Sequence, residues 1–233
     1  MNEYPAPATL AIADIEGFAR RNDLEQRQAR DALYTWLSGA LGALWGRCVH
    51  EDRGDAVLML WPADVPRPVI VAAVLRLAEA APAAPPRLRV VLHAGDVYRD
   101  PRGFVGGDVN EAFRLNEAPV LKAALKRARG PVAYLVSEQV HRGIVRYGDP
   151  AVDPEAFRPV GVAVKETRVR AWLYVPGDDG DAARLAADAF RPPSGPSPDT
   201  PPGMPPGPVP GGVRIQGRNV TVTDSEIAGR DLR

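Results

Sequence analysis

An asparagine and an arginine stand four residues apart in the segment "VNEAFR", as Asn110 and Arg114, directly after the glycine-rich run "GFVGGD". If a helix begins here, residues four apart lie on one face, one turn from each other. An amide and a guanidinium would then be presented side by side. Taken alone, the pair also fits a capping-region amide and a solvent-exposed arginine.

Two carboxylates follow short apolar or turn segments. Asp14 ends the run "TLAIAD", and Asp55 lies in the tight turn of "RGDA". If these segments are neighbours in a sheet, both carboxylates reach one edge, where with the Ile15 carbonyl they form an oxygen cage suited to Mg²⁺ or Mn²⁺. Spacing alone equally allows Asp14 to cap the following turn and Asp55 to be an ordinary turn residue.

Three further residues have side chains that could take part in binding or catalysis. Lys165, in "VAVKET", is one of three lysines among the 29 Lys and Arg of the chain, and it also fits an exposed strand residue. Glu51 also fits a charge on an edge strand. His93, in "LHAG", is more typical of a strand histidine with satisfied partners than of a catalytic base.

The elements that must position these residues follow from hydrophobic periodicity. The predicted order is strand 9–14, helix 24–45, strands within 47–62 joined at 53–55, helix 68–81, strand 87–98, helix 109–128 with a break before Pro119, strand 131–137, helix 137–147, and a hairpin of 157–166 and 169–176. This alternation predicts an α/β sandwich with a mixed sheet and helices packed on it.

The chain divides by composition. Residues 1–177 form the predicted domain, 178–190 a short helix, and 191–212, rich in Pro and Gly, a semi-rigid linker that could also be a ligand for a proline-binding domain. In the last segment, 213–233, "IQGRNV" recurs as "IAGRDL". Two copies are too few for a free-standing solenoid, so this segment suits strand addition or stacking with other chains, or is a poorly ordered tail.

Composition excludes several classes of protein. The 233 residues are 45% hydrophobic and 25% charged with a formal net charge of +0, so no global charge favours nucleic acid or an anionic membrane. The single cysteine, Cys48, allows no internal disulfide and no thiolate metal cluster. With no basic leader and no long apolar run, we expect a cytoplasmic protein.

Four motifs occur in a defined order: "LAIADIEGF", "EDRGDAVLML", "LHAGDVYRDPRGFVGGDVNEAFR" and "PVGVAVKE". Together, from about Thr9 to Pro176, they resemble the catalytic domains of class III nucleotidyl cyclases, the adenylate and guanylate cyclases. The motifs "DIEGF", "HEDRGD" and "VKET" are similar to those of compact bacterial variants of this family. The resemblance implies a ferredoxin-like mixed sheet covered by helices.

The resemblance also implies roles for residues. Two divalent ions, Mg²⁺ or Mn²⁺, would be held by Asp14, Asp55 and the Ile15 carbonyl, next to the nucleotide-binding Gly17 and Phe18 of "DIEGF". Arg114 would stabilise charge on the α-phosphate of a nucleoside triphosphate, Lys165 charge on the leaving phosphates, and Asn110 would orient the ribose. Such cyclases are homodimers with shared sites. One subunit would supply the aspartates, and the other Glu51, Asn110, Arg114 and Lys165.

The resemblance also implies two positions for base recognition. Glu51 occupies the first base-reading position of the family and is compatible with guanine. Gly103 occupies the second, where an aspartate or cysteine is expected, and would leave room for a different reader. We expect GTP or a pyrimidine nucleotide, as anti-phage cyclases use, in preference to ATP.

Two functions follow for intracellular signalling. One is a cyclase that converts an NTP to a 3′,5′-cyclic NMP and pyrophosphate. The other is an inactive module that binds nucleotide or dimerises. In both, residues 213–233, which resemble short amyloid-type signalling motifs, would bind a partner or self-assemble.

Overall fold

The computed structural model describes residues 4–148, 153–177 and 179–189. Its strands are β1 (Ala6–Ile15), β2 (Val49–Asp52), β3 (Ala56–Pro62), β4 (Leu88–Asp100), β5 (Gly103–Val105), β6 (Val132–Ser137), β7 (Arg158–Val164) and β8 (Thr167–Tyr174). Its α-helices are α1 (Asp23–Leu41), α2 (Arg67–Leu75), α3 (Gly107–Asn116), α4 (Pro119–Arg127), α5 (Glu138–Gly143) and α6 (Asp179–Ala189). The predicted linker 191–212 and the repeat segment 213–233 lie outside the described residues.

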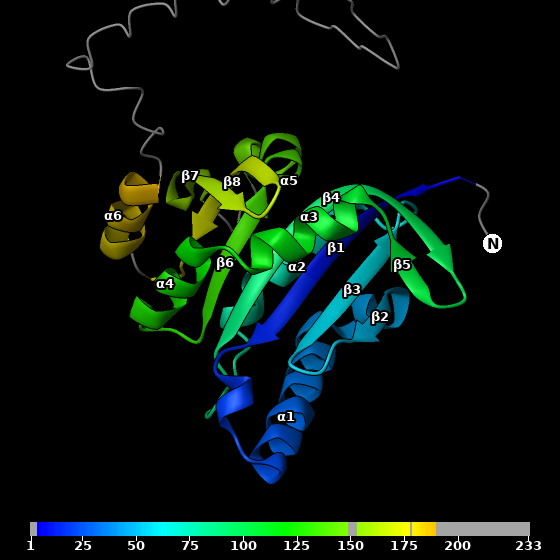
Figure 1. Cartoon of the computed structure of the whole chain (residues 1–233), viewed down its shortest axis with the longest axis horizontal. Helices are drawn as coiled ribbons and strands as arrows, with labels where there is room; N and C mark the ends of the chain where they lie inside the picture. Colours follow the sequence, from blue (N-terminus) through cyan, green and yellow to red (C-terminus); the bar gives the residue numbers. More distant parts are fainter. Residues whose placement is uncertain (1–3, 149–152, 178, 190–233) are drawn as a thin grey trace, which may run out of the picture. The chain divides into compact units, whose positions relative to one another are not determined.

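The strands form one mixed sheet in the order β2-β3-β1-β4-β6-β8-β7, with β5 paired to β4 (Figure 1). Along this path only β4 and β6 pair in parallel. The order β4-β1-β3-β2 of the first four strands, with α1 and α2 as their crossovers, is the ferredoxin-like arrangement. The predicted fold class is confirmed.

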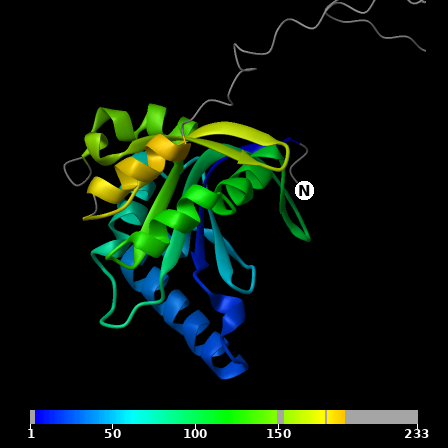
Figure 2. The same ribbon diagram turned by 60° about the vertical axis from the view of Figure 1, so that its left-hand side comes forward.

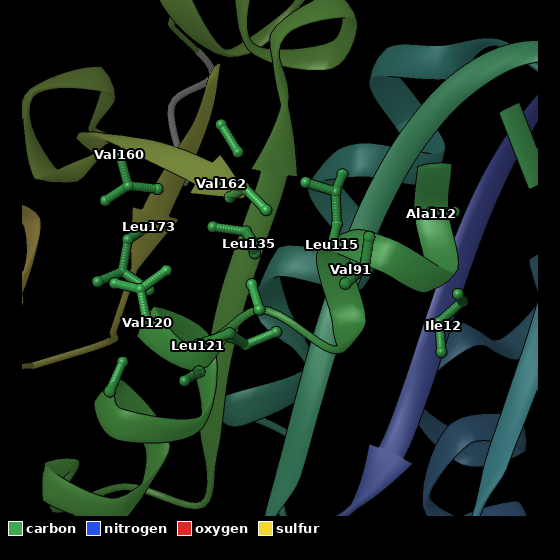
Figure 3. Packing of buried hydrophobic residues seen from close by; sticks show 14 of the residues in the cluster. Ile12, Val91, Ala112, Leu115, Val120, Leu121, Leu135, Val160, Val162 and Leu173 are labelled. Atoms are coloured by element: carbon green, nitrogen blue, oxygen red, sulfur yellow. The ribbon is translucent and has the colours of Figure 1, made fainter. Parts of the chain in front are cut away.

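Side chains of the central strands alternate between two helical layers. In β1, Leu10 and Ile12 join the core under α3, α4 and α6, whereas Ala11 and Ala13 join the core under α1, α2 and α5. α3 and α4 cross the near face of the sheet in Figures 1 and 2. Figure 3 shows side chains of β1, β4, β6, β7 and β8 gathered beside those of α3 and α4. The sheet therefore has helices on both faces.

Helix ends account for most differences from the predicted elements. α1 begins with a capping box between Asn22 and Glu25 and ends at Leu41, because Gly42 takes a left-handed φ of 52° and a 3₁₀ helix continues to Arg47. Similarly, α2 ends at Leu75 and a 3₁₀ turn follows. The break before Pro119 separates α3 from α4 as predicted, since proline disfavours a helical residue before it.

β5 was not predicted, because its three residues are too few to carry an alternation signal. It pairs with the end of β4, Tyr98 opposite Val105, and forms an arm that turns back toward β2. None of the described helices is both long and apolar enough to span a membrane.

Candidate functional site

The two predicted metal ligands lie next to each other where β1 ends. Asp14 pairs with Ala56 of β3, and Asp55 directly precedes Ala56 in the turn from β2. The Ile15 amide donates a hydrogen bond to the Asp55 carbonyl at 2.9 Å. Burial raises the pKa of the Asp14 carboxyl, and the negative charge of Asp55 raises it further.

Both oxygens of Asp14 already have partners. The side chain is on the same face of β1 as Ile12, beneath α3, where the Asn116 amide donates to Oδ2 at 2.7 Å and the Arg89 guanidinium pairs with Oδ1. Arg89 stands directly opposite Asp14 in the β1–β4 register. These two partners lower the pKa of Asp14, although burial has the larger, opposite effect. A metal ion bound here would have to displace Arg89 or share the Asp14 carboxylate with it.

The donor set nevertheless fits a divalent cation. Two neighbouring carboxylates and the carbonyl of Ile15 are the oxygen ligands that Mg²⁺ and Mn²⁺ accept, and a cation would relieve the repulsion between Asp14 and Asp55. In residues 4–148, 153–177 and 179–189, no three His, Cys, Asp or Glu side chains gather to hold a metal. The remaining ligands would therefore come from the backbone and a bound substrate.

The predicted phosphate-binding cations are paired with two glutamates. Arg114, on α3, contacts Glu166 at 3.3 Å and Glu117 at 3.6 Å, and the Lys165 ammonium lies 3.8 Å from Glu117. Lys165 adopts a left-handed φ of 50° in the two-residue turn between β7 and β8, which brings Glu166 to Arg114. We call Arg114, Glu117, Lys165 and Glu166 the α3 ion cluster. The structure thus joins Arg114 and Lys165, which the sequence only paired by resemblance.

Asn110 lies in the first turn of α3, exposed, one turn before Arg114. Its helix is fixed to β4 by Asp108, which accepts from the Asp96 amide at 2.6 Å and lies 3.3 Å from His93 Nε2. A Cβ on Gly95 would collide with the Asp108 carboxyl, so this approach needs glycine. His93 is fully buried, as a structural histidine would be, but only Nε2 has a hydrogen-bond partner; Nδ1 is buried without one, so the prediction of satisfied partners holds for one ring nitrogen.

The two predicted base-reading positions touch each other. Glu51 on β2 accepts a hydrogen bond from the Phe104 amide at 3.0 Å and pairs with Arg53. Gly103 precedes Phe104 at the tip of the β4–β5 arm, with φ of 134°, and a Cβ there would overlap the Glu51 carboxylate. In this structure the Glu51 carboxylate occupies the space beside Gly103, so a different base-reading group there would have to displace it.

Replacing Gly103 with alanine is expected to destabilise the fold by about 1–3 kcal/mol, since the new Cβ is strained at this φ and displaces Glu51 from the Phe104 amide. The matched control is Gly39→Ala on the exposed face of α1, where a Cβ meets no atom within 4 Å and helix propensity improves. Urea unfolding of both variants measures the difference. Equal stability of the two would contradict the close contact between Gly103 and Glu51.

Gly17 and Phe18 follow Asp14 in the chain. We call Asp14 and Asp55 the acid pair. Gly17 is exposed with a left-handed φ of 68°, and a Cβ there would meet no atom within 4 Å. Phe18 begins a 3₁₀ turn and packs, partly buried, against the core on the α1 side. Gly17 therefore lines open space beside Asp14, whereas Phe18 anchors the loop.

The acid pair and the α3 ion cluster occupy different places along the sheet. Asp14 lies opposite Arg89, which pairs with Ala133 at the start of β6. The Lys165 turn instead lies beyond Ser137, at the other end of β6, since Ser137 pairs with Ala171 and β8 runs back from there to Thr167. Among the described residues, no hydrogen bond or ion pair joins Asp14 or Asp55 to Asn110, Arg114 or Lys165. We call the acid pair and the α3 ion cluster the two half-sites. They are neighbours at the end of α3, since Asn116, which donates to Asp14, directly precedes Glu117 of the cluster.

The sequence did not predict four residues that lie around these half-sites: Arg89, Asn116, Glu117 and Glu166. Arg89 and Asn116 reach Asp14 across 75 and 102 residues of chain, which no local pattern records. Glu117 and Glu166 had a local signal, because they stand three residues after Arg114 and one after Lys165.

No protein-family model matches the chain, and no curated protein matches its sequence. Solved structures do match. The guanylyl cyclase Cya2 has a TM-score of 0.53 at 16% identity, over 74% of this chain and 94% of that one. The Adenylate/Guanylate Cyclase/Hydrolase from Silicibacter pomeroyi has a TM-score of 0.53 at 20% identity, over 75% and 99%. A dimeric guanylyl cyclase domain of the RhoGC fusion protein from Blastocladiella emersonii, whose dimer is a non-standard one, has a TM-score of 0.50 at 18% identity, over 75% and 98%.

Proposed function

We propose that this chain, which has the fold of the adenylyl and guanylyl cyclase catalytic domains, is a metal-dependent nucleotidyl cyclase. The observation that carries the proposal is the juxtaposition of Asp14 and Asp55 at the end of β1. Two carboxylates beside a backbone carbonyl and an open glycine loop suit the binding of a divalent ion and a triphosphate.

The reaction would be attack of the ribose 3′-hydroxyl on the α-phosphate, with release of pyrophosphate. Bound Mg²⁺ or Mn²⁺ would supply activation of the hydroxyl and neutralisation of phosphate charge. Arg114 would stabilise the negative charge that develops on the α-phosphate, and Lys165 the charge on the departing pyrophosphate. Asn110, exposed one turn from Arg114, would hold the ribose by hydrogen bonds.

We further propose a homodimer with shared sites. Among the described residues, no hydrogen bond or ion pair joins Asp14 or Asp55 to Asn110, Arg114 or Lys165 within one chain, and a second copy would supply the missing half of each site. The Blastocladiella emersonii domain, which has the same fold, is also dimeric, although its dimer is of a non-standard kind. One subunit would supply Asp14 and Asp55, and its partner Glu51, Asn110, Arg114 and Lys165.

GTP is the substrate we favour. The Glu51 carboxylate is an acceptor, which suits the N1 and N2 donors of guanine and not the N6 donor and N1 acceptor edge of adenine. The contact with Phe104 holds this carboxylate in place. A pyrimidine triphosphate remains the alternative substrate, since Gly103 adds no side chain to define the base.

Mass spectrometry of the products formed from each of the four NTPs, with Mg²⁺ or Mn²⁺ and the full chain, tests this proposal. We expect a cyclic nucleotide and pyrophosphate in equal amounts from GTP, and EDTA should abolish both. Absence of a cyclic product from all four nucleotides, with a folded and dimeric protein, would overturn the assignment.

A second function is favoured by a specific observation. Both oxygens of Asp14 have partners, and Arg114 and Lys165 are paired with Glu117 and Glu166, so the residues that a cyclase needs are engaged inside the chain. An inactive module that binds nucleotide and signals through residues 213–233 would show this arrangement. Nucleotide binding without turnover, together with loss of self-association after deletion of residues 213–233, would identify that function.

A further inference from the structure

A cavity lined mainly by basic side chains lies beside the acid pair. It has a volume of about 620 Å³ and is lined by Glu16, Gly17, Arg20, Arg21, Arg89, Lys122 and Lys126. We call it the basic cavity. Its residues come from the loop after β1, from β4 and from α4, so the fold gathers them from segments far apart in sequence. The space in front of Gly17 is open, because a Cβ there would meet no atom within 4 Å.

The charge in this cavity is not balanced. Five lining residues are cationic and one is a carboxylate. That carboxylate, Glu16, is already paired with Arg87 outside the lining, with Arg87 Nε 2.9 Å from Oε2. Among the described residues, Arg20, Lys122 and Lys126 make no ion pair. Like charges held together without counter-ions repel, so a bound anion would stabilise this arrangement.

Arg89 connects the cavity with the acid pair. Its guanidinium pairs with Asp14, yet its Nε is buried without a hydrogen-bond partner. Because Nε exposes almost no surface, a ligand in the cavity would reach Arg89 through the 15% of its side chain that is exposed. A ligand bound here would therefore lie within reach of the residue that now neutralises Asp14.

The two lysines give the cavity its shape preference. Lys122 and Lys126 are one turn apart on α4, whose apolar residues Leu121 and Leu125 face the core. They are two of only three lysines in a chain that otherwise uses arginine. An ammonium on a flexible stem donates in any direction, so two of them one turn apart can follow an extended anion.

We propose that the basic cavity binds a condensed phosphate, two or more linked phosphate groups, with Lys122 and Lys126 as its selecting residues. Two cations one helical turn apart match successive phosphates of one chain, whereas a single orthophosphate reaches fewer of the five cations. The cavity itself does not depend on cyclisation. The condensed phosphate has two possible sources. One is the triphosphate of a nucleotide bound at Asp14, and this source rests on the proposed function. The other is free pyrophosphate or polyphosphate.

Calorimetric titration of the full chain in EDTA, without any nucleotide turnover, tests the cavity. Pyrophosphate and tripolyphosphate are expected to bind more tightly than orthophosphate. The double substitution Lys122→Gln/Lys126→Gln should weaken pyrophosphate binding by about tenfold or more, because each substitution removes a charged hydrogen bond to a phosphate group. Lys122→Arg/Lys126→Arg keeps both charges and should lose less affinity for pyrophosphate than the glutamine variant. Arg127→Gln, an exposed cation of α4 outside the lining, should change affinity by less than about twofold.

Equal loss in the Lys122→Gln/Lys126→Gln and Arg127→Gln proteins, no binding of pyrophosphate, or equal affinity for orthophosphate would overturn the proposal. GTP added in EDTA separates the two sources. Displacement of tripolyphosphate by GTP supports the nucleotide as ligand, and binding of tripolyphosphate that GTP does not displace supports free condensed phosphate. Because no product is measured, an inactive protein does not affect the result.

Discussion

Two inactive variants of this chain are expected to restore one another's activity when they are mixed. Asp55→Asn and Arg114→Ala should each lower the rate of cyclic nucleotide formation by about 10²–10³, since each removes a charge that acts on the reacting phosphates. Mixed in equal amounts with free exchange of subunits, they should recover about a quarter of the wild-type activity.

The arithmetic follows from the two half-sites. In a mixed dimer, one site would combine the altered Asp55 with the altered Arg114 and be inactive. The other site would combine an intact acid pair with an intact α3 ion cluster. Half of the dimers would be mixed, and each would hold one working site of two. A site built within a single chain gives no recovery.

Asp64→Asn serves as the matched control. Asp64 is an exposed aspartate paired with Arg47 beyond the other end of β3, away from the acid pair, so its loss should leave the rate within about twofold. The measurement is cyclic product formed per minute by each single variant and by the mixture. A mixture no more active than its two components would contradict the shared site, and substantial activity of Asp55→Asn alone would contradict the role of the acid pair.

The order of helices and strands can be predicted from the sequence because buried apolar residues recur along the chain with a clear period. The apolar run that ends at Asp14 is buried on both faces, and α1 carries Leu33, Leu37 and Leu41 at helical spacing. Helix ends were less predictable, since Gly42 and the 3₁₀ turn after it end α1 by backbone conformation and not by a change in hydrophobicity. β5 depends on its pairing with β4 and has no pattern of its own.

The candidate site was predictable where motif spacing carried the information and unpredictable where folding creates the contact. Asp55 comes beside Asp14 because β3 pairs with β1, which follows from the hairpin and the sheet order. The partners of Asp14 required the register of β4 and the end of α3. The resemblance that placed Arg114 and Lys165 in a phosphate site said nothing of Glu117 and Glu166, which neutralise them in this chain.

Removing Arg89 is expected to destabilise the protein strongly and in a pH-dependent manner. Arg89→Met would keep most of the buried volume but leave the Asp14 carboxylate, on a side chain that is 9% exposed, with Asn116 alone. Breaking a buried ion pair from one side typically costs about 3–5 kcal/mol. We expect a loss near the lower end at pH 7, because Asn116 retains its hydrogen bond.

The sign of the pH dependence follows from the pKa of Asp14. Burial already raises this pKa above its ordinary value of 3.8, and Arg89 lowers it, so the substitution raises it further. A carboxyl with a raised pKa in the folded protein favours the fold when protonated, and this stabilisation is lost as the pH rises through the folded pKa. The deficit of Arg89→Met relative to wild type should therefore be largest at neutral pH and shrink toward pH 4.

Urea unfolding in EDTA at pH 7 and near pH 4.5 measures the deficit, with Asp14→Asn/Arg89→Met as the matched double variant. Replacing the carboxylate with an amide removes the uncompensated charge, so the double variant should recover most of the stability at pH 7 and show little pH dependence of its own. A deficit that is the same at both pH values, or that the double variant does not reduce, would mean that Arg89 stabilises the sheet by packing and not by neutralising Asp14. Recovery in the double variant would instead show that Arg89 stabilises the fold by neutralising Asp14. Arg89 would then pair with the buried carboxylate when no metal ion is bound there, and the same residue lines the basic cavity.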